Sequence, residues 1–354
     1  MIEKLKLNET PVRTTRNYNI NNIKLDNINI PENIPDFNSI DIEERENILI
    51  DKEKKVVNIA YGVGDIITNL INEKSNNNLN IDIDKEQDGK IKVLFNFNMQ
   101  NTLLLDNIHI IAHENSNANI IIKYESEKDI EAFHAGMIKV IAKKNANVKI
   151  TVVNLLNNES NNFISMESEL YANSNVDYTI IDFGGKNSIT NYYSNLLGEN
   201  SSNNLDTIYL GNNEQLFDLN YIGELRGKKA NINMNIQGAL NDYSKKHFKG
   251  TIDFKKDCKK AKGDETENCI LLSDKAKSLS LPMLLCSEED VEGNHSSSAG
   301  KIDNAQLFYI MSRGFDIKEA MKLIVRARFN NVLKKIQDEE LKNEILSEID
   351  NRIR

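Results

Sequence analysis

The sequence predicts a mainly β protein, in which a parallel β-helix core follows a small N-terminal region and precedes a C-terminal α-helical domain. Three observations support this fold class. Short segments rich in Ile, Val, Tyr and Phe follow one another, each bounded by Asn, Ser or Gly. Units made of a polar turn and a strand recur at a nearly constant spacing. Beyond about residue 300, the apolar residues adopt the spacing of amphipathic helices instead.

The repeat defines the core. Units such as NSNANIII, KNANVKIT and NSNVDYTI each place a polar turn before a strand. If Ile120, Val148, Val176, Leu205 and Ile232 are equivalent, the spacings between them are 28, 28, 29 and 27 residues. A period of this size is typical of a solenoid, and Asn suits its turns because it tolerates a left-handed backbone. A two-sheet sandwich with evenly spaced strands is the alternative.

The prediction divides the chain into three parts: an N-terminal mixed or helical region at 1–85, the core at 86–300 and the helical domain at 301–354. In the first part, Ser39 or Asp41 is expected to begin a helix through Glu46. In the core, we expect strands over the apolar segments 91–97, 108–112, 120–124, 137–142, 148–155 and 178–183.

Beyond the core, the sequence predicts three helices. Capping-box patterns that begin at Asp303, with Gln306, and at Asp316 are expected to start two of them, and Asp338 the third. Gly314 is placed to end the first helix. One face of the second helix is marked by apolar residues: Ala320, Leu323, Ile324, Ala327, Val332 and Ile336. These helices could cap the solenoid or dock a partner.

Composition narrows the functional classes. The chain has 354 residues, and 44 Lys and Arg against 53 Asp and Glu give a net charge of −9. No basic stripe interrupts this acidic balance, which argues against a nucleic-acid partner. We find no apolar run long enough to span a membrane and no signal peptide, so a cytoplasmic location is expected. The three cysteines form no C-x-x-C pair and therefore predict neither a disulfide framework nor a zinc site.

The sequence lacks the usual enzymatic motifs. There is no phosphate-binding P-loop, no dinucleotide fingerprint, no H-E-x-x-H and no G-x-S-x-G. His109 and His113, four residues apart, are expected to be surface or turn residues. A carbohydrate-active β-helix enzyme is disfavoured because Trp is absent and aromatic residues make up only 6% of the chain. A solenoid that only binds proteins is the other alternative.

His295 precedes a run of small residues, 296–300, and is expected in the turn between the core and the helices. An imidazole among small side chains could present a nitrogen to a metal such as iron. An ordinary turn histidine is the alternative that the residues alone leave open.

The same region carries a family resemblance. The segment VEGNHSSSAGKIDNAQLFYIMSRGF, residues 291–315, resembles the C-terminal signature of the SufB/SufD family of iron–sulfur assembly scaffolds. The similarity extends to ILLSDKAKSLSLP at 270–282, and PVRT at 11–14 is similar to the N-terminal P-x-R-T of SufD-type members. The resemblance implies a right-handed parallel β-helix and a non-enzymatic scaffold, most like SufD. A SufB-like scaffold that acts without a separate SufD is the alternative.

The resemblance also implies site residues. The family places a required histidine at the position of His295, where it handles iron or the nascent cluster at the SufB–SufD interface. Cys258, Cys269 and Cys286 are weaker candidate ligands, and Cys258 and Cys286, 28 residues apart, could stack on adjacent coils. SufD-type members often have Cys where this chain has Gly293, so a full ligand set is not expected here.

Partners follow from the resemblance as well. It implies a SufB-like scaffold partner, a SufC-like ABC-type ATPase bound through residues 303–353 and, indirectly, a cysteine desulfurase. Lys318, Arg326 and Arg328 are the exposed positions at which we expect the ATPase to dock. An iron–sulfur cluster would be held transiently, at an interface that the ATPases distort when they dimerise. FAD occurs in complexes of the family, but the sequence has no flavin fingerprint.

Overall fold

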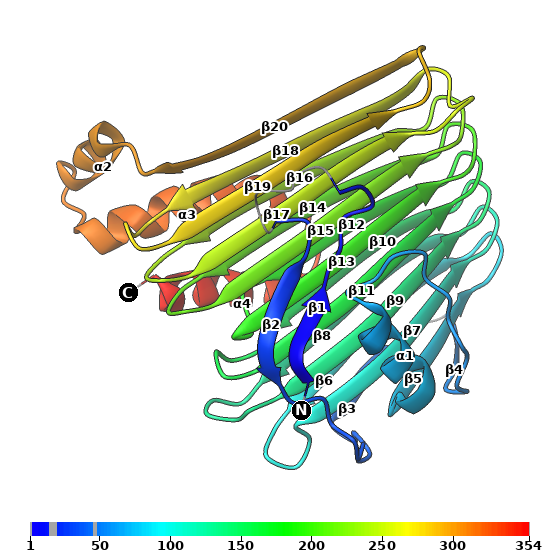
Figure 1. Ribbon diagram of the computed structural model, residues 1–354, viewed down its shortest axis with the longest axis horizontal. Coiled ribbons are helices and arrows are strands. Elements are labelled where there is room, and N and C mark those ends of the chain that lie inside the picture. The colour runs from blue at the N-terminus through cyan, green and yellow to red at the C-terminus, as the bar shows by residue number, and fades with distance from the viewer. Residues whose placement is uncertain (1, 14–19, 45–47, 354) are drawn as a thin grey trace.

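The computed structural model describes residues 2–13, 20–44 and 48–353 and confirms a mainly β fold with a solenoid core (Figure 1). Each coil contributes one strand to each of two nine-stranded sheets. Sheet I runs β3 (Ile40–Glu44), β6 (Asp88–Phe97), β8 (Asn117–Ser126), β10 (Asn147–Leu155), β12 (Asn175–Asp182), β14 (Ser202–Gly211), β16 (Asn231–Leu240), β18 (Ala261–Leu271), β20 (Val291–Lys301). Sheet II runs β4 (Ile48–Asp51), β5 (Asn77–Ile83), β7 (Leu103–Ala112), β9 (Phe133–Ala142), β11 (Asn161–Leu170), β13 (Asn187–Leu196), β15 (Leu216–Leu225), β17 (Lys245–Phe254), β19 (Lys277–Cys286). Neighbouring strands within each sheet come from successive coils and run parallel, except that β3 and β4 pair antiparallel with their neighbours. This arrangement is that of a β-helix and not of a simple sandwich.

The predicted repeat exists, but its register differs from the predicted equivalences. Val148 pairs with Val176, as predicted. Leu205 pairs with Tyr178 instead, and Ile120 likewise pairs two residues away from the predicted position. A shift of two residues keeps each side chain on the same face of its strand. The apolar pattern alone therefore cannot distinguish the two registers when turns differ in length.

Asparagine recurs at one turn of successive coils for a backbone reason. Asn115, Asn145, Asn173 and Asn200 have positive φ angles of 61, 60, 57 and 56°. Their side chains form a ladder, in which each amide nitrogen donates to the preceding Oδ1 at 2.7, 3.1 and 3.2 Å. Asn thus tolerates the left-handed backbone and also links one coil to the next.

The space between the sheets is mainly apolar, and it contains a network of polar side chains around His134. His134 places Nε2 2.6 Å from Asp106 Oδ1 and Nδ1 2.6 Å from Asn162 Oδ1. The Tyr124 hydroxyl donates to the other Asp106 oxygen at 2.9 Å. The Asn162 amide nitrogen donates to Ser188, which orients its oxygen toward His134. All five side chains are buried, so their mutual pairing removes the cost of desolvating them.

Three helices follow the core, as predicted: α2 (Asn304–Met311), α3 (Ile317–Leu333) and α4 (Glu339–Arg352). Asp316 forms the predicted capping box at the start of α3, and Asp338 caps α4. Asp303 caps α2 by accepting a hydrogen bond from the Ala305 amide, rather than through the predicted box with Gln306. No helix of the three described ranges is long and apolar enough to cross a membrane.

Helices α3 and α4 pack on the outer face of sheet I (Figure 1). The buried face of α3 differs from the predicted one, because Leu323 and Ala327 are exposed whereas Val325 and Phe329 are buried. The apolar outer surface of β10, β12 and β14 selects the face that docks, and this surface is not visible in the helix sequence itself. Gly314, with a φ of 99°, redirects the chain between α2 and α3.

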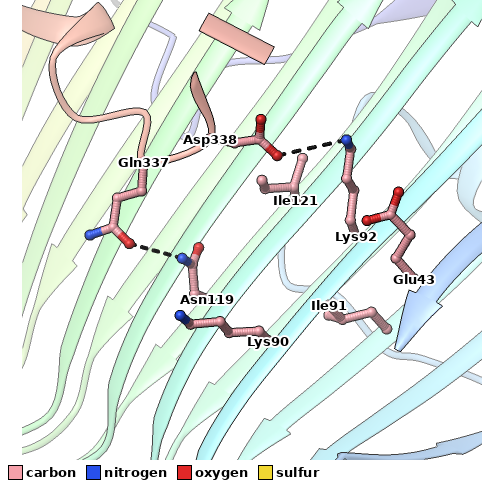
Figure 2. Close-up of a pocket in the computed structure, with 8 residues that line it drawn as sticks. All are labelled: Glu43, Lys90, Ile91, Lys92, Asn119, Ile121, Gln337 and Asp338. Carbon is pink, nitrogen blue, oxygen red and sulfur yellow. Dashed lines mark hydrogen bonds and ion pairs between the residues drawn. The ribbon is translucent and has the colours of Figure 1, made fainter. Parts of the chain in front are cut away.

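The link between α3 and α4 is tied to sheet I near the first coils (Figure 2). Gln337 accepts a hydrogen bond from Asn119 at 3.0 Å, and Asp338 lies 3.7 Å from the Lys92 ammonium. A hollow of about 250 Å³ lies beside these contacts. Polar contacts therefore fix the helical domain to the solenoid beyond the apolar contact of α3.

The N-terminal region closes the first coil. Strands β3 and β4 pair antiparallel with β6 and β5, and α1 (Asp65–Lys74) lies beside sheet II (Figure 1). The helix predicted from Ser39 or Asp41 is wrong, because residues 40–44 form β3. The free edge of β6 supplies hydrogen-bonding groups that outweigh the local helical preference. The end of that predicted helix, Arg45 and Glu46, and Thr14 of the PVRT motif lie outside the described residues.

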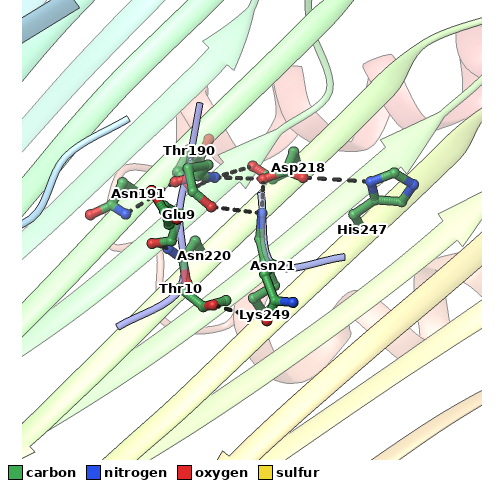
Figure 3. A network of polar contacts seen from close by, with 10 residues as sticks. Glu9, Thr10, Asn21, Thr190, Asn191, Asp218, Asn220, His247 and Lys249 are labelled. Carbon is green, nitrogen blue, oxygen red and sulfur yellow. Dashed lines mark hydrogen bonds and ion pairs between the residues drawn. The ribbon is translucent and has the colours of Figure 1, made fainter. Parts of the chain in front are cut away.

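An N-terminal hairpin of β1 (Ile2–Leu7) and β2 (Ile23–Ile28) leads into a buried polar network on the outer face of sheet II (Figure 3). The Asn8 amide nitrogen donates to the Asp218 carboxylate at 2.7 Å and to the Thr190 carbonyl at 3.0 Å. Lys249 lies 2.5 Å from the same carboxylate. Burial alone would raise the pKa of Asp218, but the charge of Lys249 and the hydrogen bonds from His247 and Lys249 together outweigh it and hold the pKa below its usual value. The network fastens the N-terminal segment to β13, β15 and β17.

Candidate functional site at the open end of the solenoid

The last coil is uncovered. β19 and β20 each pair with a strand on one side only, and no strand of the described residues pairs with their other edges. Most residues of β20 are exposed. On β19, Leu279 and Leu284 are 49% and 40% exposed. We call this surface, formed by β19 and β20, the open end.

His295 lies at the middle of this surface. The sequence predicted a turn at His295, and this prediction is wrong. The residue lies within β20, where it pairs in register with Glu265 of β18. The serines that follow it continue the parallel pairing with β18, and their hydroxyls also donate to side chains of that strand. Ser297 donates to Glu267 at 2.8 Å and Ser298 donates to Asn268 at 2.6 Å. Small residues that suggest a turn in the sequence therefore form an edge strand.

A buried ion pair lies one layer beneath the open end. Lys246 of β17 and Glu267 of β18 are 2.8 Å apart, and both side chains are fully buried. The Tyr209 hydroxyl donates to one Glu267 oxygen at 3.0 Å, and Ser280 donates to the other at 3.0 Å. This network links both sheets to both edge strands, so it positions the last coil on the one below.

Glu265 shares that layer but has no such partners. Its side chain points into the solenoid and is 1% exposed, yet neither carboxylate oxygen has a hydrogen-bond partner among the described residues. Burial, together with the charge of Glu267, raises the pKa of Glu265 to about 8.

The three cysteines occupy different environments. Cys269 is buried in β18, and burial raises the pKa of its thiol. Cys258 is buried in the turn after β17, where burial raises its pKa to about 11. Cys286 is exposed at the end of β19 and pairs in register with Phe254, not with Cys258. The predicted stacking of Cys258 on Cys286 is therefore wrong. The two buried thiols are poor thiolate donors in this state.

The predicted residues thus come together only in part. Cys286 borders a hollow of about 630 Å³ that is also lined by Gly293 and Leu284, while His295 lies further along β20. No group of three or more His, Cys, Asp or Glu within the described part of the chain could hold a metal ion by itself. A metal held at the open end would need ligands from elsewhere.

The second predicted surface is at the helices. Lys318 and Arg328 are exposed, but Arg326 forms an ion pair with Asp350 of α4 and contributes to the packing of two helices. The larger feature is apolar. Helix α2 has no buried residue, and the segment from α2 into α3 exposes Phe308, Tyr309, Met311, Phe315, Ile317 and Leu323. We call these six residues the α2 apolar surface.

The sequence matches a known family. The sequence model of the SUF system FeS cluster assembly SufBD core domain matches residues 95–328, which include most of the solenoid, the open end, α2 and much of α3. The chain belongs to the SufBD family. Membership agrees with the resemblance of the region around His295.

Individual relatives agree with the family assignment. The chain is 23% identical to the iron–sulfur cluster assembly protein SufD of Bacillus subtilis, over 75% of this chain and 61% of that protein. It is 24% identical to the iron–sulfur cluster assembly protein SufD of Escherichia coli, over 69% of this chain and 58% of that protein. An iron–sulfur cluster assembly SufBD family protein of Pyrococcus horikoshii is 29% identical to it, over 65% of this chain and 51% of that protein. The chain thus spans about half to three-fifths of the length of these relatives, and it is most like SufD.

Sequence reasoning missed the buried acidic residues of this SufBD chain. Glu265 and Glu267 lie in the segment AKGDETENCIL, which has too few apolar residues to mark a strand. The signal was nevertheless present, because the segment falls one repeat after β16, and alternate positions of such a strand must face the interior.

Proposed function

We propose that the chain is a SufD-like scaffold subunit that pairs with a SufB-like partner through the open end. This proposal rests on the last coil, where the outer edges of β19 and β20 have no strand partner among the described residues. Free strand edges offer unpaired N–H and C=O groups, and monomeric proteins normally cover, bend or charge them. Leu279 and Leu284 add exposed apolar side chains to these edges.

The role we propose is assembly and not catalysis by this chain. His295 would present its imidazole at the interface, where the partner supplies the remaining ligands of iron or of a nascent cluster. The cluster is therefore cargo that two subunits share. The name SufD borne by two relatives, and their description as assembly proteins, support this role.

We further propose that the helical domain binds a SufC-like ATPase, with the α2 apolar surface as the contact. Six exposed apolar residues on a protruding helix and its continuation resemble the apolar centre of a protein interface. Lys318 and Arg328 lie exposed on α3 and suit the polar rim of that interface. Arg326 does not, because its charge is already paired with Asp350.

Co-purification of the three subunits tests both contacts. Leu279→Glu with Leu284→Glu should release the SufB-like partner and retain the ATPase. Phe308→Ser with Met311→Ser should release the ATPase and retain the scaffold partner. Leu49→Glu, at a residue that is 64% exposed on β4 at the opposite end, is the matched control and should retain both. Retention of the SufB-like partner by the first double variant would refute pairing through the open end.

A further inference from the structure

Glu265 occupies a place prepared for its carboxylate. A Cβ atom added at Gly250, across the interior, would lie only 2.1 Å from one Glu265 oxygen and 2.5 Å from the other. Glycine at this position therefore leaves the space that the carboxylate fills. The carboxylate is buried there without a hydrogen-bond partner among the described residues, and an ionised carboxylate in such a place is costly unless a cation accompanies it.

The nearby lysine does not provide that cation. Lys246 lies 2.8 Å from Glu267, and it also donates to the Ser280 hydroxyl at 2.9 Å and to the Leu279 carbonyl at 3.3 Å. An ammonium group has three protons to donate, and these contacts use them. Lys246 therefore neutralises Glu267 and not Glu265.

His295 is the neighbour of Glu265 on the open side. The two residues pair in the parallel register of β18 and β20. Residues paired in this way project to the same face of a sheet, so the side chain of His295 leaves its strand on the same face as that of Glu265, one coil further on. On the other side, β16 places Met234 next to Glu265, which contributes no charge.

We propose that Glu265 and His295 together bind a divalent first-row metal ion at the open end, with Glu265 as the oxygen ligand and His295 as the nitrogen ligand. Carboxylate and imidazole are both ligands that Fe²⁺ accepts. The inference rests on the proposed function, in which the cargo is iron, and deepens it by naming a second ligand on this chain. Because His295 is exposed, the remaining coordination positions would face the partner subunit.

The test is calorimetric titration of the purified full chain with Co²⁺ alone, without partners. Wild type should bind one ion more tightly than its surface acids do. Glu265→Gln and His295→Ala should each weaken that step at least tenfold, because each removes one ligand. Asp264→Asn is the matched control, since Asp264 is exposed on the other face of the same strand and accepts a hydrogen bond from Asn294. It should bind Co²⁺ as wild type does.

The outcomes separate this site from the proposed function. Wild-type affinity in Glu265→Gln, an equal loss in Asp264→Asn, or no such step in wild type would each overturn the site. Melting temperatures identify a variant that fails to fold, and Glu265→Gln keeps the shape of the side chain. A chain that shows the Co²⁺ step but never co-purifies with a SufB-like protein would refute the proposed function and leave the site standing.

Discussion

The two ends of the solenoid are built from the same repeat but finish differently. At the first coil, β3 and β4 pair antiparallel with β6 and β5, the first strands of the parallel stacks, and Phe37 packs its ring 5.1 Å from that of Phe97. At the last coil, β19 and β20 keep free edges and exposed side chains. A β-helix must cover its ends to avoid uncontrolled association, and the described residues complete only the first of the two ends.

The buried carboxylates show the same contrast. Asp106, near the covered end, is bonded to Tyr124 and His134. Glu267, at the open end, is neutralised by Lys246, whereas Glu265 beside it has no partner among the described residues. Asp106 and Glu267 thus have hydrogen-bond or ion-pair partners within the chain, whereas neither oxygen of Glu265 has one among the described residues. Four substitutions of carboxylate by amide, which keep the side-chain shape, measure this difference.

The largest effect is expected for Glu267→Gln. It removes one charge from a fully buried pair and leaves the Lys246 ammonium uncompensated, which should cost about 3–5 kcal/mol in the free energy of unfolding. Urea denaturation measures this cost. Adding Lys246→Met to the same chain should restore much of the loss. A cost below about 1 kcal/mol for the single variant would show that the pair does not hold the last coil.

The fold was predictable from the sequence because its signals are local and repeated. Turn asparagines, apolar strands and helix caps each depend on a few neighbouring residues. The register and the docked face of α3 depend on contacts between distant segments, so Leu205 and Leu323 were assigned wrongly. The same limit applies to β3, whose residues 40–44 form a strand only because β6 offers them an edge.

The second largest effect concerns Asp182, which accepts hydrogen bonds from Asn154 and Ser188 in the middle of the solenoid. Burial raises its pKa from 3.8 to about 6, so the folded protein keeps a proton that the unfolded chain releases. The resulting stabilisation is complete below about pH 4 and disappears as the pH rises past about 6. Wild type should therefore lose about 3 kcal/mol between about pH 4 and pH 7 relative to Asp182→Asn. Urea denaturation at the two pH values measures this, and parallel pH profiles would contradict it.

A smaller effect is expected for Asp106→Asn at the covered end. The amide offers one acceptor oxygen where Tyr124 and His134 both need one, so one buried donor loses its partner. A buried donor without a partner should cost about 2 kcal/mol in the free energy of unfolding. Thermal and urea unfolding measure it, and Tyr124→Phe, which removes one hydrogen bond only, is the matched comparison. An equal cost for both variants would show that the histidine contact contributes little.

The site was less predictable than the fold for a physical reason. His295 was identified from its surrounding motif, but its place in an edge strand depends on hydrogen bonds to β18 that no local pattern encodes. Glu265 carried no motif at all, and only the parallel register places it beside His295. Arg326 looked exposed because the Asp350 that pairs with it lies on the next helix.

The smallest loss of stability is expected for Glu265→Gln, which therefore tests most directly whether the two ends of the solenoid differ. Because the carboxylate has no partner among the described residues, its replacement by a neutral amide of the same shape removes no hydrogen bond and avoids burying a charge. At neutral pH the variant should be at least as stable as wild type, because the raised pKa of Glu265 makes its carboxyl group unfavourable in the fold, whereas Glu267 and Asp106 support the fold. Urea denaturation of the isolated chain at neutral pH measures this difference against Glu267→Gln under the same conditions. A loss of about 2 kcal/mol or more would mean that Glu265 stabilises the last coil, and the two ends would then differ only in how their edges are covered.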